Sequence, residues 1–173
     1  MTETSANPPA QKETPILVIG VGNVYRGDDA VGRIVAQGLK KESPDCVNII
    51  EKGGDGIALM ESWEGADTVI LIDAVHSGAL PGTIHRLDAH AQPIPARYFH
   101  YSTHAFGVAE AVELSRTLNQ LPLRFIIYGI EGKCFEPGGG LTGEVAKAAQ
   151  DVLAQIQHDI ACFSLSKKND EMM

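Results

Sequence analysis

Three segments of the chain carry side chains whose types and spacing could perform chemistry together. An acidic pair, Asp28 and Asp29, follows an apolar run and a Gly-x-Gly turn in "VIGVGNVYRGDDAVG" (18–32). A third carboxylate, Asp73, lies in "LIDAV", and His104 lies in the loop "HYSTHAFG". Two carboxylates and an imidazole suit a borderline divalent ion such as Ni²⁺, Zn²⁺ or Cu²⁺. Three protein ligands would leave coordination positions open, as a catalytic or exchangeable site requires.

Each of these side chains also has a structural alternative. Asp28 stands where a helix N-cap would stand, so we predict a cap there and expect Asp28→Asn to be tolerated. Asp29 would then interact with the helix dipole, the third carboxylate would cap a turn, and His104 would be an ordinary loop histidine. His100 and His76 are weaker alternatives for the imidazole ligand.

The Gly-x-Gly turn, formed by Gly20 and Gly22, raises a second possibility, which is a dinucleotide site. That fingerprint requires a further glycine at the position of Tyr25, and the acidic pair would repel a pyrophosphate. We therefore assign the two glycines to a tight turn without side-chain obstruction, with Asn23 bonded to local backbone. The chain also lacks a G-x-S-x-G elbow and an H-E-x-x-H helix, and "EPGGGLTGE" lacks the lysine of a P-loop.

Strand and helix patterns alternate along the chain and must position these segments. Apolar runs predict five strands, at 15–20, 47–50, 68–75, 82–87 and 123–130. Amphipathic runs predict four helices, at 30–41, 56–63, 107–120 and 141–157. This order predicts an α/β fold, a three-layer α/β/α sandwich around a largely parallel, twisted sheet of about five strands. In such folds the working groups lie beyond the carboxyl ends of strands.

We expect one domain at 15–160, between a flexible N-terminal tail at 1–14 and a C-terminal tail at 161–173 that frays or continues the last helix by a turn. The 173 residues carry a formal net charge of −8 and no basic cluster, which argues against a nucleic-acid partner. No apolar run reaches the roughly 20 residues that span a bilayer, and no signal peptide is present, so we expect no membrane partner. Three cysteines without a CxxC pair are typical of a reduced cytoplasmic protein, and one small domain predicts a monomer.

Four motifs together resemble those of the [NiFe]-hydrogenase maturation endopeptidases. They are "GVGNVYRGDDAVG", "VILIDAV", "STHAFGVAEAVELSRTL" and "IYGIEGKCFEPGGGLT", and the resemblance covers about Ile16 to Ile156. It implies a protease that removes a short C-terminal extension from the precursor of the hydrogenase large subunit after nickel insertion. It also implies that Asp29, Asp73 and His104 contact nickel. We expect the substrate to carry this nickel and other divalent ions to substitute for it.

The resemblance also gives a role to the loop after the second predicted strand, "EKGGDGIA". Gly53, Gly54 and Asp55 correspond to residues that help the family to recognise its substrate. The loop lacks the threonine that the family usually has there, which leaves its role open.

Two candidates remain for the group that attacks the peptide bond. One is a water held by the metal, because coordination lowers the pKa of water. The other is a water activated by a carboxylate base, Asp29 or Asp73. Nickel would then be the recognition element. Two other function classes stay open: a non-proteolytic nickel-binding or metallochaperone-like protein of hydrogenase assembly, and a nucleotide-dependent enzyme.

Overall fold

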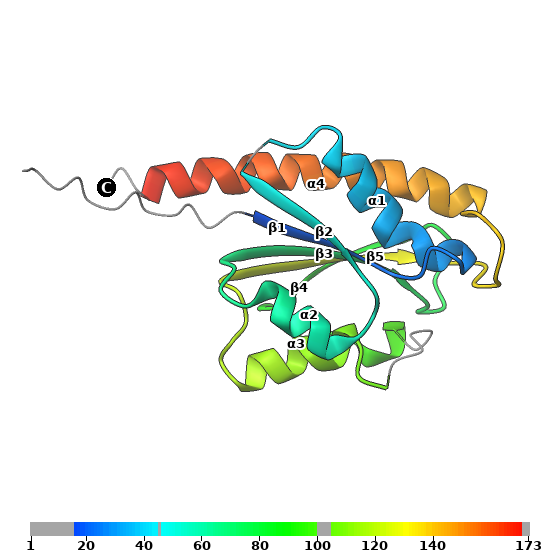
Figure 1. Ribbon diagram of the computed structural model, residues 1–173, viewed down its shortest axis with the longest axis horizontal. Helices are drawn as coiled ribbons and strands as arrows, with labels where there is room; N and C mark the ends of the chain where they lie inside the picture. The colour runs from blue at the N-terminus through cyan, green and yellow to red at the C-terminus, as the bar shows by residue number, and fades with distance from the viewer. Residues whose placement is uncertain (1–15, 45, 100–104, 171–173) are drawn as a thin grey trace, which may run out of the picture.

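The sheet at the centre of the molecule has the predicted three-layer α/β/α setting. The computed structural model describes residues 16–44, 46–99 and 105–170, and in them the sheet has five strands in the order β2-β1-β3-β5-β4 (Figure 1). β1 (Ile16–Val21), β2 (Val47–Lys52), β3 (Thr68–Val75) and β5 (Arg124–Glu131) run parallel. β4 (Ile84–Asp88) pairs antiparallel with β5 at one edge. The predicted fold class is confirmed.

Within the described ranges, two helices cover each face of the sheet. α1 (Val31–Lys40) and α4 (Gly143–Asp170) lie on one face, and α2 (Gly56–Trp63) and α3 (Val108–Thr117) lie on the other (Figure 1). Two short 3-10 turns, Gly27–Ala30 and Ala96–Phe99, precede α1 and α3 along the chain. The predicted helix at 56–63 and the predicted strand at 68–75 agree with α2 and β3 at both ends.

α4 extends further than the sequence pattern predicts. It has 28 residues and runs to Asp170, past the predicted helix end at 157 and through most of the segment 161–173 that we expected to be a tail. Val145, Val152 and Ile156 are fully buried and join the core on this face of the sheet. No helix in the described part of the chain, α4 included, combines the length and apolar character needed to cross a membrane.

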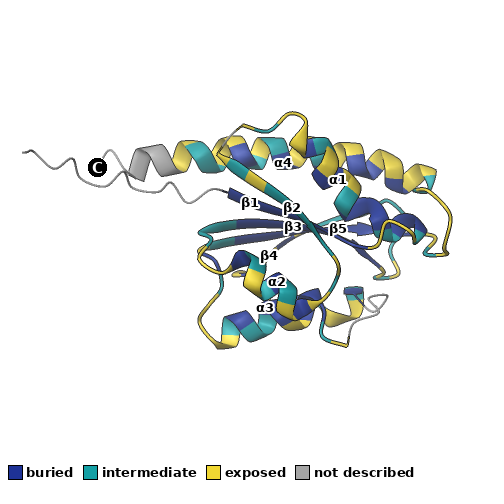
Figure 2. Ribbon diagram, in the orientation of Figure 1, coloured by how far each residue is buried: buried dark blue, intermediate teal, exposed yellow. Residues whose placement is uncertain are grey.

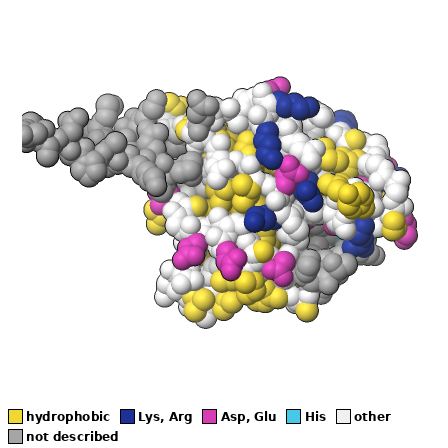
Figure 3. Space-filling model, viewed as in Figure 1, with side chains coloured by type: hydrophobic (Ala, Val, Ile, Leu, Met, Phe, Trp, Pro, Cys, Tyr) yellow, Lys and Arg dark blue, Asp and Glu magenta, His cyan; other side chains and the backbone are white. Residues whose placement is uncertain are grey.

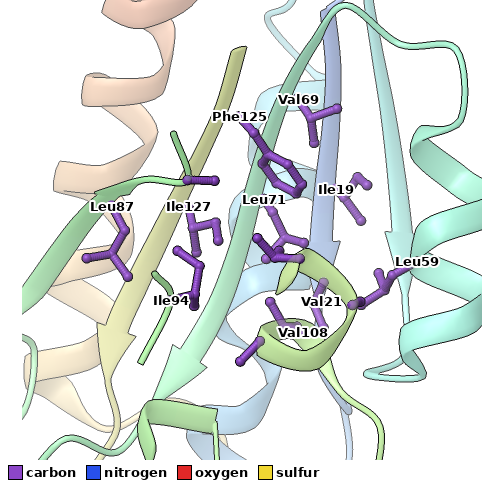
Figure 4. Close-up of a cluster of buried hydrophobic side chains, with 14 of the residues drawn as sticks. Ile19, Val21, Leu59, Val69, Leu71, Leu87, Ile94, Val108, Phe125 and Ile127 are labelled. Atoms are coloured by element: carbon purple, nitrogen blue, oxygen red, sulfur yellow. The ribbon is translucent and has the colours of Figure 1, made fainter. Parts of the chain in front are cut away.

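Alternate residues of the central strands build two apolar cores. On β3, Val69 and Leu71 pack with residues of α2 and α3, whereas Ile70 and Ile72 pack with residues of α1 and α4. This is the two-residue period of a strand. Figure 4 shows the first core, where Leu59 of α2 approaches the strands. β1, β3 and β5 are buried along nearly their whole length (Figure 2), which explains their almost continuous apolar sequences.

Close packing of α1 against the sheet depends on glycine. A Cβ on Gly32, in the first turn of α1, would lie 2.2 Å from the carbonyl oxygen of Ile72 and 2.4 Å from that of Val21. A Cβ on Gly20 of β1 would lie 2.4 Å from the carbonyl oxygen of Gly32. The backbone of α1 therefore rests directly on the backbones of β1 and β3. The helix-packing glycine that is missing at position 25 is supplied by Gly32.

We expect Gly32→Ala to destabilise the protein by about 2–3 kcal/mol, because the added methyl group overlaps two strand carbonyls. Helix propensity alone would predict the opposite change, because alanine is favoured over glycine inside a helix by about 1 kcal/mol. Urea unfolding measures the change. Gly143→Ala is the matched control, because Gly143 opens α4 and a Cβ there meets no atom within 4 Å. A Gly32→Ala protein as stable as the control would contradict this account of the packing.

Candidate functional site

A cleft opens at the carboxyl ends of β1 and β3, where the strand order changes direction. β2 lies on one side of β1, and β5 and β4 lie on the far side of β3. In open α/β sheets this switch point is where ligands bind. The cleft has a volume of about 220 Å³ and is lined by the loop after β1, by the loop after β2 and by the end of β3. It brings together six of the predicted site residues: Gly22, Asn23, Asp29, Gly53, Gly54 and Asp73.

Asp73 contributes a buried carboxylate to this cleft. The residue lies near the end of β3 and is only 7% exposed. Its Oδ1 accepts a hydrogen bond of 2.8 Å from the backbone N–H of Ala74. Burial raises the pKa of Asp73 well above its ordinary value, and the negative charge of Asp29 raises it further. The site therefore holds a carboxyl group in surroundings that disfavour its charge.

Asp29 is the second carboxylate of the cleft and lies in the 3-10 turn that leads into α1. It is half-buried, and its Oδ2 accepts a hydrogen bond of 3.1 Å from the backbone N–H of Asn23. Burial raises the pKa of Asp29, while this hydrogen bond and the charge of Arg26 partly oppose that shift. The two acids thus differ in access, because Asp29 is partly exposed to solvent and Asp73 is almost closed to it.

The turn after β1 brings the backbone close to Asp29. Gly22 has a φ of +137°, and a Cβ there would lie 1.8 Å from the carbonyl oxygen of Asp29. Asn23 accepts a hydrogen bond of 2.9 Å from the backbone N–H of Tyr25 through its Oδ1, which closes the turn. Gly20 contributes differently, because it lies within β1 and packs against α1.

Asp28 is not a helix cap, and the prediction that it caps α1 is wrong. The residue before α1 is Ala30, with no side-chain cap, and Asp28 is fully buried. Its Oδ2 accepts hydrogen bonds from the backbone N–H groups of Lys133 (2.8 Å) and Cys134 (2.9 Å). Its Oδ1 accepts one of 2.7 Å from the N–H of Thr142, whose hydroxyl also lies 3.0 Å from Oδ2. The carboxylate therefore ties the loop after β1 to the loop after β5.

The loop after β2 divides between the cleft and α2. Gly53 and Gly54 line the cleft, and a Cβ on Gly53 would meet no atom within 4 Å. The backbone at Gly53 is therefore not covered by other residues of the described part of the chain. Asp55 is not among the cleft residues, because its Oδ1 accepts a hydrogen bond of 2.8 Å from the N–H of Ala58 and so caps α2.

The predicted imidazole ligand, His104, lies outside the described residues, as does the alternative His100. His76, the other alternative, is not among the cleft residues, and its Nδ1 lies 3.9 Å from Oε1 of Glu131. Within the described part of the chain, no group of three or more His, Cys, Asp or Glu side chains could hold a metal ion. The described cleft thus contains two carboxylates, and the metal-binding triad stays a prediction.

Among the cleft residues that sequence reasoning missed are four with side chains from the loop after β1 and from α1. Val24 and Tyr25 project from the loop after β1, with exposed fractions of 37% and 78%. Exposed apolar groups at the mouth of a cleft are typical of a site that contacts another molecule. Arg26 and Arg33 add positive charge, and Nε of Arg33 lies 3.2 Å from Glu51. The sequence feature that could have identified Val24 and Tyr25 is the presence of a valine and a tyrosine inside a glycine-rich turn.

Comparison with known proteins places the chain among proteases. The sequence model of the hydrogenase maturation protease family matches residues 33–159. The hydrogenase 2 maturation protease of Escherichia coli (strain K12) is 30% identical over 145 residues, which cover 82% of this chain and 87% of that protein. The hydrogenase expression/formation protein HupD of Bradyrhizobium diazoefficiens is 27% identical over 162 residues, 92% of this chain and 82% of that protein. The solved structure of the hydrogenase maturating endopeptidase HybD from E. coli superposes with a TM-score of 0.73 at 28% identity, covering 85% of this chain and 92% of that one.

We expect Asp28→Asn to lower the free energy of unfolding by about 2 kcal/mol or more. Both carboxylate oxygens of Asp28 accept backbone N–H groups, so the amide NH₂ of asparagine would face a donor in either orientation. Urea unfolding measures the loss, and Asp29→Asn at the neighbouring position is the matched control. Equal stability of the two variants would show that Asp28 does not anchor the loop.

Asp73→Asn has the opposite expected effect on stability. A carboxyl group whose pKa is raised by folding makes the native state bind more protons than the unfolded chain. The raised pKa of Asp73 costs folding free energy only where the unfolded chain has lost this proton. The cost is therefore absent below the ordinary pKa of 3.8, and it grows as the pH rises towards the folded-state pKa. Asp73→Asn should therefore raise the free energy of unfolding at neutral pH, with little change below 3.8. Urea titrations at both pH values test this, and an equal change at both would contradict the electrostatic argument.

Proposed function

The chain belongs to the hydrogenase maturation protease family, and we propose that it is an endopeptidase that removes the C-terminal extension of a [NiFe]-hydrogenase large-subunit precursor after nickel insertion. The observation that carries the proposal is the cleft in which Asp29 and Asp73 share one opening with the backbone of Gly53 and Gly54. Two carboxylates supply groups for acid–base chemistry. The open glycine backbone beside them leaves room for a peptide.

We propose that Asp29, Asp73 and His104 read the nickel that the precursor carries. Like charges in one cleft repel each other, and the repulsion contributes to the raised pKa of Asp73. A divalent cation between the two carboxylates would remove this repulsion, so the cleft should prefer a nickel-bearing precursor to an empty one. Carboxylate oxygens and an imidazole nitrogen are suitable ligands for nickel, and other divalent ions fit the same donor set. His104 enters this triad through the family motif alone.

Asp29 is the better placed of the two candidate bases. It is half-buried, whereas Asp73 is almost closed to solvent, so a water molecule reaches Asp29 more readily. We propose that Asp29 accepts a proton from the attacking water as the oxygen bonds to the scissile carbonyl carbon. The proton then passes to the leaving amine nitrogen. Asp73 contributes a second carboxylate, and the nickel would favour the ionised form that burial and Asp29 oppose in the protein alone.

The substrate is held, in this proposal, by the loop after β2 and by the exposed side chains of the loop after β1. Gly53 and Gly54 offer backbone groups to the peptide, and Asp55 supports them by capping α2. Val24 and Tyr25 cover apolar side chains of the precursor. We propose that the protein acts as a monomer in the cytoplasm, where its exposed free cysteines, Cys46, Cys134 and Cys162, would stay reduced.

Mixing the purified protein with nickel-loaded or nickel-free precursor tests the proposal. We expect a discrete C-terminal peptide to be lost only from the nickel-loaded precursor, as followed by mass spectrometry. Asp29→Ala, Asp73→Asn and His104→Ala should each slow this cleavage by about 100-fold or more. Circular dichroism should show that the three variants remain folded.

Asp151→Asn provides the control for a lost carboxylate, because Asp151 is exposed on α4, the helix that covers one face of the sheet outside the cleft. Its activity should equal that of the wild type. Stable binding of the nickel-loaded precursor without cleavage would contradict the proposal and favour the non-proteolytic nickel-binding alternative.

A further inference from the structure

The helical layer formed by α2 and α3 carries a second hollow, which the proposed reaction does not use. It has a volume of about 400 Å³, and Ile57, Met60 and Trp63 of α2 give it an apolar lining. Ser115 of α3 also lines it. In Figure 3, acidic side chains lie beside an apolar strip in the lower part of the molecule, where Figure 1 places these two helices. We call this hollow the α2–α3 groove.

Two acidic side chains of the groove are unpaired. Glu61 and Glu64 are exposed, and neither side chain forms a hydrogen bond or an ion pair with any residue in the described ranges. Ile57, which lines the same groove, is 54% exposed. An apolar surface next to uncompensated negative charge is complementary to an apolar side chain with cationic neighbours.

Ser115 adds an unused polar atom. The residue is fully buried, and its Oγ has no hydrogen-bond partner within the described part of the chain. A buried hydroxyl without a partner costs about 1–3 kcal/mol, so such atoms call for an explanation. A backbone group of a segment inserted into the groove would provide the missing partner.

The groove is continuous in sequence with the cleft. Gly54 lines the cleft and Ile57 lines the groove, with only Asp55 and Gly56 between them. α2 begins at this point, capped by Asp55. A single partner molecule can therefore reach from the cleft onto the face of α2.

We propose that the α2–α3 groove is a second docking site for the protein substrate and binds a segment with an apolar side chain flanked by lysine or arginine. The apolar side chain packs against Ile57 and Met60, above the buried Trp63, and its cationic neighbours pair with Glu61 and Glu64. The inference rests on the proposed function in one respect, which is that the partner in the groove is the precursor that occupies the cleft.

Binding can be measured without catalysis, because Trp63 is the single tryptophan of the chain and lines the groove. A short synthetic peptide with a leucine between lysines should change the emission of Trp63 saturably, and added salt should weaken this binding. The same peptide with glutamates in place of lysines should not bind. Glu61→Lys and Glu64→Lys should each weaken binding about fivefold or more. Asp151→Lys, the same charge change on α4, should leave it unchanged.

Cleavage kinetics give the second test. Docking outside the cleft adds equally to ground-state and transition-state binding, so Glu61→Lys and Glu64→Lys should raise KM for the precursor about fivefold with kcat unchanged. A short peptide that spans only the cleavage site should be cleaved equally by wild type and variants. An unchanged KM for the precursor, with wild-type cleavage intact, would overturn the docking site and leave the proposed function standing.

Two further outcomes are also decisive. If the wild type does not cleave the precursor, the proposed function is wrong but the docking proposal is not yet tested. Titration of Trp63 emission with intact precursor then shows whether the groove binds it. If ultracentrifugation finds a dimer that Glu64→Lys dissociates, a second copy of the chain fills the groove and the docking proposal is wrong.

Discussion

Two carboxylates in one cleft, one of them nearly closed to water, form the constraint on which the rest of this structure depends. Charge repulsion and burial both oppose the ionised form of Asp73, so the pair is unfavourable in the protein alone. It persists because the two acids are held by neighbouring strands: Asp29 follows β1, and Asp73 lies near the end of β3. The hydrogen-bonded register of these strands is fixed by two apolar cores. Burial of those cores outweighs the local cost. Under the proposed function, the nickel of the precursor would offset the repulsion between the two acids.

The scaffold meets this constraint mainly through its backbone. Gly20 and Gly32 allow α1 to approach the sheet closely, and this fixes the turn that carries Asp29. The neighbouring acid, Asp28, turns inward and binds the loop after β5. Two aspartates in adjacent positions therefore have different roles. One is fully satisfied and holds the loop, and the other is left with capacity to bind at the cleft.

The features predicted best from the sequence are the helices and strands whose bounds depend on local residue patterns. The helix at 56–63 and the strand at 68–75 agree at both ends, because apolar periodicity and turn residues mark their limits. Asp28 was misassigned because its position resembles that of a cap, while its real partners lie in a loop remote in sequence. The α2–α3 groove was invisible for the same reason, since Ser115 and Glu61 are unremarkable helix positions until two helices are packed together. The role of His104 still rests on its motif.

The bridge between the first and last loops has a consequence for biosynthesis. The groups that donate to Asp28 lie 105 to 114 residues after it. Chains leave the ribosome N-terminus first, so β1 and its loop are made long before those donors exist. β5, which separates β3 from β4 in the sheet, is equally late. A nascent chain that has not reached Thr142 thus contains both acids of the cleft but lacks the brace that orients one of them. The turn that carries Asp29 is therefore braced only after Thr142 has been made.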